Sequence, residues 1–119
     1  MAIFFYQSRT DDMIISAGYN IAGPEVEACL LTHAAVAECG VVGAPDEARG
    51  QIVKAYVVPA PGTLEQAGGA AALVALLQAH VKQAIAPYKY PRQIEFVEAL
   101  PRTETGKLQR FKLRASATA

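Results

Sequence analysis

The sequence is poor in the residues that build metal sites and disulfide frameworks. Its 119 residues include two cysteines and two histidines. Cys29 and Cys39 form no Cys-x-x-Cys pair, and no pair of histidines accompanies them at the spacing of a zinc site. The pattern therefore indicates neither a disulfide framework nor a zinc site, and we expect no metal bound by the chain itself. Two buried, reduced thiols in a cytoplasmic protein are the simpler interpretation.

Long apolar runs are missing as well. The run from Ala2 to Tyr6 is far too short for a signal peptide or a membrane span, and no basic residues flank it. We therefore expect no membrane insertion.

The chain has no excess of either charge, because 11 basic residues balance 11 acidic ones. Their distribution is uneven, since eight of the basic residues follow His80 and eight of the acidic residues precede it. This cationic C-terminal third could be a solvated face, a weak nucleic-acid footprint or a seat for a phosphorylated ligand. Phe111 is the only aromatic residue after Phe96, so we expect no nucleic-acid partner.

What is present indicates one small globular domain. The composition is 52% hydrophobic and 18% charged, which is typical of such a domain. A chain of 119 residues has room for a single hydrophobic core and little more. We therefore treat residues 1–119 as a single domain.

Hydrophobic spacing predicts a mixture of strands and helices. Residues 11–21 are typical of a hairpin whose turn holds Gly18 and Asn20, residue types that tolerate a positive φ angle. Pro24 suits the first position of a helix, and a second, strongly periodic helix ends before Pro87. The other expected elements are strands at 36–42, 52–58 and 91–97, a loop at 44–50, the periodic helix at 73–84 and a final helix at 108–115.

These elements predict an α+β fold class. We expect an N-terminal β-hairpin followed by a small, about three-stranded sheet covered by two helices, with a short C-terminal helix. That last helix should bury Leu108 and Phe111. His33 and His80 lie in the apolar stripes of the first two helices, where histidines usually pack or cap, so neither is assigned a catalytic role.

A polar segment near the C-terminus holds residue types that suit chemistry on anions. It reads Pro-Arg-Thr-Glu-Thr-Gly-Lys-Leu-Gln-Arg over residues 101–110. Lys107 carries a compact ammonium on a flexible stem, and Gly106, which lacks a Cβ, lets the backbone come close to a ligand. The segment lacks the earlier glycine and the following Ser or Thr of a P-loop. A solvated surface lysine is the alternative interpretation of Lys107.

Three segments together resemble the C-terminal domain of the adenylate-forming superfamily. They cover residues 9–27, 88–92 and 101–110, and they follow that family's order and spacing over nearly the whole chain. The superfamily contains acyl-CoA synthetases, the adenylation domains of peptide synthetases and firefly luciferases. The first segment is most similar to the corresponding part of benzoate- and 2-aminobenzoate-CoA ligases.

The resemblance implies a two-step acid–thiol ligation. A carboxylate would attack the α-phosphate of ATP, used with Mg²⁺, to give an acyl-adenylate and pyrophosphate. The thiol of coenzyme A would then attack the acyl carbon and release AMP. In relatives, the lysine that matches Lys107 reaches the acyl carboxylate and the nucleotide phosphate in the first step, so Lys107 is the candidate catalytic residue. A mobile positive charge placed where negative charge gathers lowers that barrier.

The resemblance also implies roles for five other positions. Asp11 matches the hinge about which the domain rotates between the two steps. Gly18 matches a residue that lines the tunnel for the pantetheine arm of coenzyme A. Arg9 matches an arginine near the nucleotide ribose. Lys89 and Arg92 match positions that meet the phosphates of coenzyme A in some relatives.

The chain departs from the family pattern at two points. Tyr90 stands where other members carry a basic residue. The family's N-terminal domain, which holds most of the ATP site and the whole carboxylate pocket, is absent from this sequence. We therefore expect a C-terminal lid domain whose partner is the N-terminal domain of the same enzyme, and we expect the chain alone to be inactive. An excised domain is the favoured explanation, with a truncated gene product or a stand-alone module acting in trans as alternatives.

Two functional alternatives stay open at this point. The chain could be a stand-alone, non-catalytic module that binds a phosphorylated ligand or a carrier protein through its basic C-terminal third. The thiol could also belong to a carrier protein instead of coenzyme A, because peptide-synthetase adenylation domains share the lysine segment and the hinge.

Overall fold

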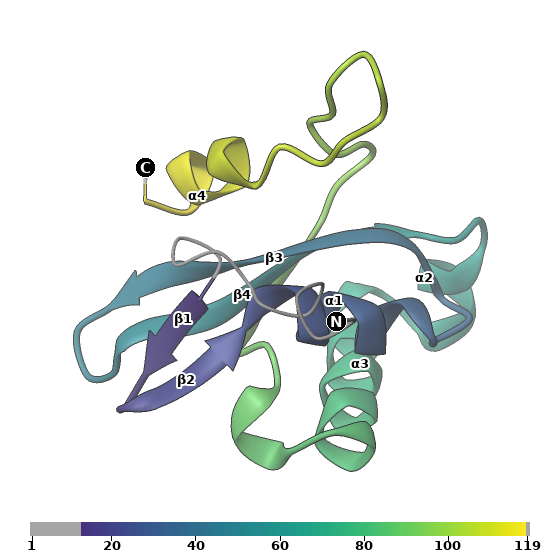
Figure 1. Ribbon diagram of the computed structural model, residues 1–119. Coiled ribbons are helices and arrows are strands. Elements are labelled where there is room, and N and C mark those ends of the chain that lie inside the picture. The colour runs from purple at the N-terminus through teal and green to yellow at the C-terminus, as the bar shows by residue number, and fades with distance from the viewer. Residues whose placement is uncertain (1–12, 119) are drawn as a thin grey trace, which may run out of the picture.

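The structure, a computed structural model, describes residues 13–118, and it confirms the α+β fold class (Figure 1). Arg9 and Asp11 lie outside the described residues. The strands are β1 (Met13–Ser16), β2 (Tyr19–Ala22), β3 (Val36–Asp46), β4 (Gly50–Pro59) and β5 (Gln93–Phe96). The helices are α1 (Gly23–Leu31), α2 (Thr63–Ala67), α3 (Ala70–Ala84) and α4 (Arg110–Thr118), and a 3₁₀ turn spans Pro87–Lys89.

The strands form two separate sheets. β1 and β2 make an antiparallel hairpin, and the second sheet has the order β3-β4-β5, with β3 antiparallel and β5 parallel to β4. The hairpin turns at Ala17 (φ 53°) and Gly18 (φ 86°), a pair of positive φ angles that matches the twist of the two strands. The predicted positive φ at Asn20 is wrong, because Asn20 lies within β2.

The core has two layers, one on each face of the larger sheet (Figure 1). Alternate residues of a strand point to opposite faces, so Val53, Ala55 and Val57 of β4 pack toward α1 and α3. Tyr56 and Val58, which alternate with these residues along β4, point to the other face and pack toward the C-terminal segment and α4. The sheet therefore holds the predicted two helices on one face and the C-terminal helix on the other.

The C-terminal helix turns a different side toward the sheet than expected. Leu113 is buried, Leu108 is half-buried and Phe111 is 57% exposed, so the predicted burial of Phe111 is wrong. The reason is helical spacing, because Leu113 and Ala117 share one face and Phe111 lies on another. Gly40 of β3 permits this packing, since a Cβ there would lie 2.5 Å from Cδ1 of Leu113.

Two connections also differ from expectation. The strands β3 and β4 continue through most of the predicted loop, which leaves a short turn around residues 47–49. The link that follows Pro59 contains the short helix α2, which was not predicted because the link is rich in proline and glycine. Local breaker residues predict a change of direction but not how few residues the turn uses.

The two histidines lie where α1 ends and the chain turns toward β3, as the expected packing and capping roles require. Nε2 of His80 lies 2.8 Å from Oγ1 of Thr32 and 3.1 Å from the carbonyl oxygen of Cys29. Nδ1 of His33 accepts a hydrogen bond of 3.0 Å from the backbone N–H of Ala35. Burial, and then the neighbouring His80, lower the pKa of His33.

Both cysteines are buried free thiols, as predicted. Burial, and then the nearby Glu27, raise the pKa of Cys39 to about 12, although Arg110 opposes this. Burial, and then Glu25, also raise the pKa of Cys29. A thiol with a raised pKa carries little thiolate at neutral pH, so neither cysteine is a candidate nucleophile.

Candidate functional site

Lys107 lies on a tight turn that is held by backbone hydrogen bonds. The N–H of Thr103 donates to the carbonyl of Lys107 at 2.9 Å, and the N–H of Gly106 donates to the carbonyl of Thr103 at 2.9 Å. The N–H of Lys107 donates to Oγ1 of Thr103 at 3.0 Å. Gly106 has φ 89°, a left-handed conformation that favours glycine. The turn therefore fixes the main chain on both sides of Lys107.

The side chain of Lys107 is exposed. Within residues 13–118, no hydrogen bond or ion pair joins its ammonium group to another side chain. A fixed backbone thus carries a charged tip that is free to meet a group from outside this domain. An internal ion pair would have contradicted the role that the sequence suggests for Lys107.

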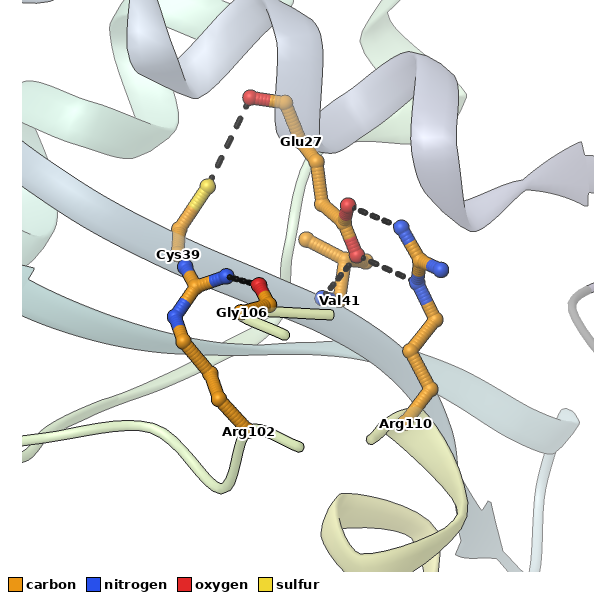
Figure 2. A network of polar contacts seen from close by, with 6 residues as sticks. All are labelled: Glu27, Cys39, Val41, Arg102, Gly106 and Arg110. Atoms are coloured by element: carbon orange, nitrogen blue, oxygen red, sulfur yellow. Dashed lines mark hydrogen bonds and ion pairs between the residues drawn. The ribbon is translucent and has the colours of Figure 1, made fainter. Parts of the chain in front are cut away.

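Arg102 ties this turn to the larger sheet, and Figure 2 shows its contact with Gly106. Its Nε and Nη2 donate to one carboxylate oxygen of Glu38 in β3, at 3.1 and 2.8 Å. Its Nη1 donates to the carbonyl of Gly106 at 2.9 Å. Backbone pairing between Arg102 and Leu108 closes the base of the turn. One guanidinium therefore bridges strand β3 and the residue that precedes Lys107.

A second arginine follows the turn and reaches into the protein. Arg110, at the start of α4, donates from Nε and Nη2 to both carboxylate oxygens of Glu27, at 2.8 and 2.5 Å. Glu27 is only 7% exposed, and its Oε2 also accepts a hydrogen bond of 2.8 Å from the backbone N–H of Val41. Figure 2 shows this carboxylate between helix α1, strand β3 and helix α4.

The hairpin turn and the 3₁₀ turn lie together on another part of the surface. The rings of Tyr19 and Tyr88 stack with their centroids 4.4 Å apart, which brings the Gly18 turn beside Lys89. A Cβ at Gly18 would have nothing within 4 Å, so the space outside this turn is open. Nζ of Lys89 forms an ion pair with Glu25 at 2.7 Å.

Arg92, at the end of the turn before β5, is exposed, and its guanidinium lies 5.0 Å from the centre of the Tyr90 ring. Lys82 approaches the same ring at 4.3 Å. Tyr90 thus joins two cations by contact with its ring. A shallow, open groove beside it is lined by Lys54, Val74, Arg92, Gln93, Ile94 and Glu95.

The predicted site residues therefore fall into two groups. Gly18 and Lys89 share the hairpin face, whereas the Lys107 turn projects from the opposite end of the molecule (Figure 1). The groove beside Tyr90 is lined by neither Lys107 nor Gly18. Arg9 and Asp11 cannot be placed, because they precede the described residues.

Sequence reasoning missed the partners that hold the lysine turn. Glu27 entered only as the last residue of the first segment that resembles the family, and Glu38 was not singled out. Arg102 and Arg110 entered only as members of the segment 101–110 and of the cationic C-terminal third. The available signal was spacing, since Glu27 lies three residues before Leu30 and so on the same side of the helix as that apolar residue, where a carboxylate requires a partner.

Residues 13–118 contain no group of three or more His, Cys, Asp or Glu side chains arranged to hold a metal ion. None of the helices in this part of the chain has the length and apolar character needed to cross a membrane.

Comparisons with known proteins find a matching family model, similar sequences and solved structures with a similar fold. A family model described as the AMP-binding enzyme C-terminal domain matches residues 25–107. The chain is 53% identical over 111 residues to YtcI of Bacillus subtilis (strain 168), described as an uncharacterized acyl-CoA ligase, covering 93% of this chain and 20% of that protein. Among solved structures, the acyl-CoA synthetase of Brucella canis has 47% identity and a TM-score of 0.84, over 94% of this chain and 20% of that one.

An anthranilate CoA ligase, AuaEII, solved in complex with anthranoyl-AMP, is 43% identical with a TM-score of 0.81. The match covers 92% of this chain and 20% of the AuaEII chain. The present chain thus spans about a fifth of the length of the relatives that it matches.

Proposed function

We propose a function from the family of this chain, which belongs to the AMP-binding enzyme C-terminal domain family. The chain is the mobile C-terminal domain of an ATP-dependent acyl-CoA ligase. Such an enzyme joins a carboxylate to ATP to form an acyl-adenylate and pyrophosphate. It then transfers the acyl group to the thiol of coenzyme A and releases AMP. The observation that carries the proposal is the exposed, unpaired ammonium of Lys107 on a backbone held rigid by hydrogen bonds.

Lys107 serves the first step. The carboxylate and the α-phosphate are both anions, so their approach is opposed by charge repulsion. An ammonium that lies between them offsets this repulsion and stabilises the negative charge that gathers in the transition state. Lysine suits the task because its charge is compact and its stem is flexible, so that it can enter and leave a site built elsewhere.

The hairpin face serves the second step. Gly18 leaves open space beside the turn, which suits the passage of a thin pantetheine arm. Because the turn between β1 and β2 and the Lys107 turn before α4 lie at opposite ends of the domain (Figure 1), the domain must rotate between the steps to present each of them to one cleft. We assign the hinge of that rotation to Asp11 and a ribose contact to Arg9.

Lys89 and Arg92 differ in their availability for the phosphates of coenzyme A. Lys89 is engaged by Glu25, so it must leave that ion pair before it can bind a phosphate. The guanidinium of Arg92 is exposed and rests against the Tyr90 ring. We therefore assign the first contact with the phosphates to Arg92, with Lys89 in support.

The remaining parts of the reaction are assigned to an N-terminal domain of the same enzyme. That partner would hold most of ATP, its Mg²⁺ ion and the carboxylic acid. Aromatic acids are the proposed substrates, and the 43% identity to an anthranilate CoA ligase supports this class. The two buried, free thiols suit a reducing compartment such as the cytoplasm.

The test is Lys107→Ala in the full-length enzyme that ends in this domain. Adenylate formation, measured by pyrophosphate exchange, should fall by about 10²–10³ because one well-placed donor is lost. Thioester formation from supplied acyl-adenylate should be unchanged. Lys112→Ala removes another exposed lysine, five residues away on α4, and should affect neither step. Equal loss in both steps, or no loss in either, would refute the role of Lys107.

A further inference from the structure

We infer that Arg102, fixed by Glu38, is a positioning residue for Lys107: its guanidinium holds the peptide group between Gly106 and Lys107 in one orientation. This inference rests on the proposed function, because it concerns the step that Lys107 serves. Arg102 would act through the backbone and would not touch a substrate.

The hydrogen-bond pattern supports this role. The carbonyl oxygen of Gly106 and the N–H of Lys107 belong to the same peptide group. Arg102 holds the carbonyl end at 2.9 Å, and Oγ1 of Thr103 holds the N–H end at 3.0 Å. Both ends of this peptide group are therefore fixed by side chains, one on each side.

The turn needs such support because of its glycine. Gly106 has no Cβ, and nothing lies within 4 Å of the position a Cβ would take. Few contacts therefore restrict its rotation. Without the hydrogen bond from Arg102, the peptide group could rotate and redirect the Lys107 stem. Misplacement of a catalytic group by about 1 Å can cost about 10²-fold in rate.

An arginine is required at this position by geometry. Three N–H groups of one planar guanidinium point in fixed directions, two toward Glu38 and one toward Gly106. A lysine presents a single point charge and cannot make this bridge. Glu38 belongs to strand β3, so the bridge transfers the rigidity of the sheet to the turn.

The Arg102–Glu38 pair contributes little to folding stability. The two side chains are 39% and 44% exposed, and exposed ion pairs contribute about 0–1 kcal/mol. The pair can therefore be removed without unfolding the domain, which makes an activity measurement interpretable.

The experiment compares Arg102→Met, Arg102→Lys, Glu38→Ala and the Arg102→Met/Glu38→Ala double variant in the full-length enzyme, beside Lys107→Ala. All four variants should lower the kcat of adenylate formation by about 10-fold or more, with the KM for ATP changed by less than about twofold. Thioester formation from supplied acyl-adenylate should be unchanged. The double variant should be no worse than Arg102→Met, because both changes remove one bridge.

Two controls separate positioning from other roles. Glu95→Ala removes another exposed carboxylate of the larger sheet, the partner of Lys54 at 3.2 Å, and should leave adenylate formation unchanged. Amide hydrogen exchange should become faster at Lys107 in Arg102→Met, because its N–H is protected only while the turn holds.

Several outcomes would overturn the inference. A loss in Arg102→Met that is absent in Glu38→Ala, or rescue by Arg102→Lys, would mean that Arg102 touches the substrate directly. Equal loss in both half-reactions would mean a general structural role. If Lys107→Ala abolishes adenylate formation and the Arg102 variants do not affect it, only this inference fails. If Lys107→Ala itself has no effect, the proposed function fails.

Discussion

At the scale of single residues, Glu27 is the acid on which the packing of the C-terminal segment depends. Its carboxylate is buried and accepts hydrogen bonds from Arg110 and from the backbone of Val41. A buried ion pair adds little folding stability compared with well-packed apolar groups of the same size. Loss of one partner, however, leaves the charge of the other buried and uncompensated. The pair therefore determines where α4 lies against the sheet.

Glu27→Ala should destabilise the chain by about 3 kcal/mol, because it leaves the Arg110 guanidinium and the Val41 N–H without their acceptor. Urea unfolding of the 119-residue chain, followed by circular dichroism, measures this change. Glu38→Ala, at the exposed Arg102–Glu38 ion pair, should cost less than about 1 kcal/mol. Similar losses in the two variants would contradict the importance of burial at Glu27.

At the scale of elements, the turn from α1 to β3 depends on a neutral histidine. Nδ1 of His33 can accept the hydrogen bond from Ala35 only while it carries no proton. Its lowered pKa agrees with this requirement. In the unfolded chain this histidine has a pKa of about 6.5. At mildly acidic pH the unfolded chain therefore binds more protons than the folded chain.

The stability contributed by His33 should be complete above about pH 6.5 and should be lost as the pH falls through the lowered pKa of the folded state. Thermal unfolding of the chain at a series of pH values, over about three pH units from mildly alkaline to mildly acidic, tests this. His33→Asn should flatten the dependence, since asparagine can accept the same i+2 hydrogen bond but does not titrate. An equally steep dependence in His33→Asn would assign the effect to other groups.

At the scale of the whole molecule, two separated surfaces are carried by one core. The hairpin with Gly18 packs beside α1. The Lys107 turn leads into α4, which covers the opposite face of the larger sheet (Figure 1). Ion pairs from Glu27 and Glu38 connect the C-terminal segment to α1 and β3. The two surfaces are therefore expected to move as one body during the proposed rotation.

If each surface serves one step, a side chain at Gly18 should impair the opposite half-reaction from Lys107→Ala. In the full-length enzyme, Gly18→Leu should lower thioester formation by about 10-fold or more and leave adenylate formation unchanged. Gly62→Leu is the matched control, because Gly62 has a similar φ of 80° and equally open surroundings at the start of α2. The control should show the same backbone strain with no effect on either step. Equal effects of the two variants would refute the assignment of Gly18.

Much of the fold could be predicted from local patterns. The hairpin, the periodic helix α3 and the alternation in β4 follow from residue preferences over a few positions. The lysine turn could also be identified from the sequence. Its residue types, and its place as the third of the segments that resemble the family, can be read directly from the chain. Gly106 and Lys107 were therefore candidates before any fold was known.

The kinds of elements, their order along the chain and the residues able to carry chemistry follow from the amino-acid sequence alone. Three other features depend on the folded arrangement of the chain: Leu113, and not Phe111, faces the sheet, Glu38 binds Arg102, and Glu27 binds Arg110. These partners are 64 and 83 residues apart in the chain. Local preferences act over a few residues, whereas the choice of a distant partner depends on the strand order, which directs the chain after β5 across the second face of the sheet.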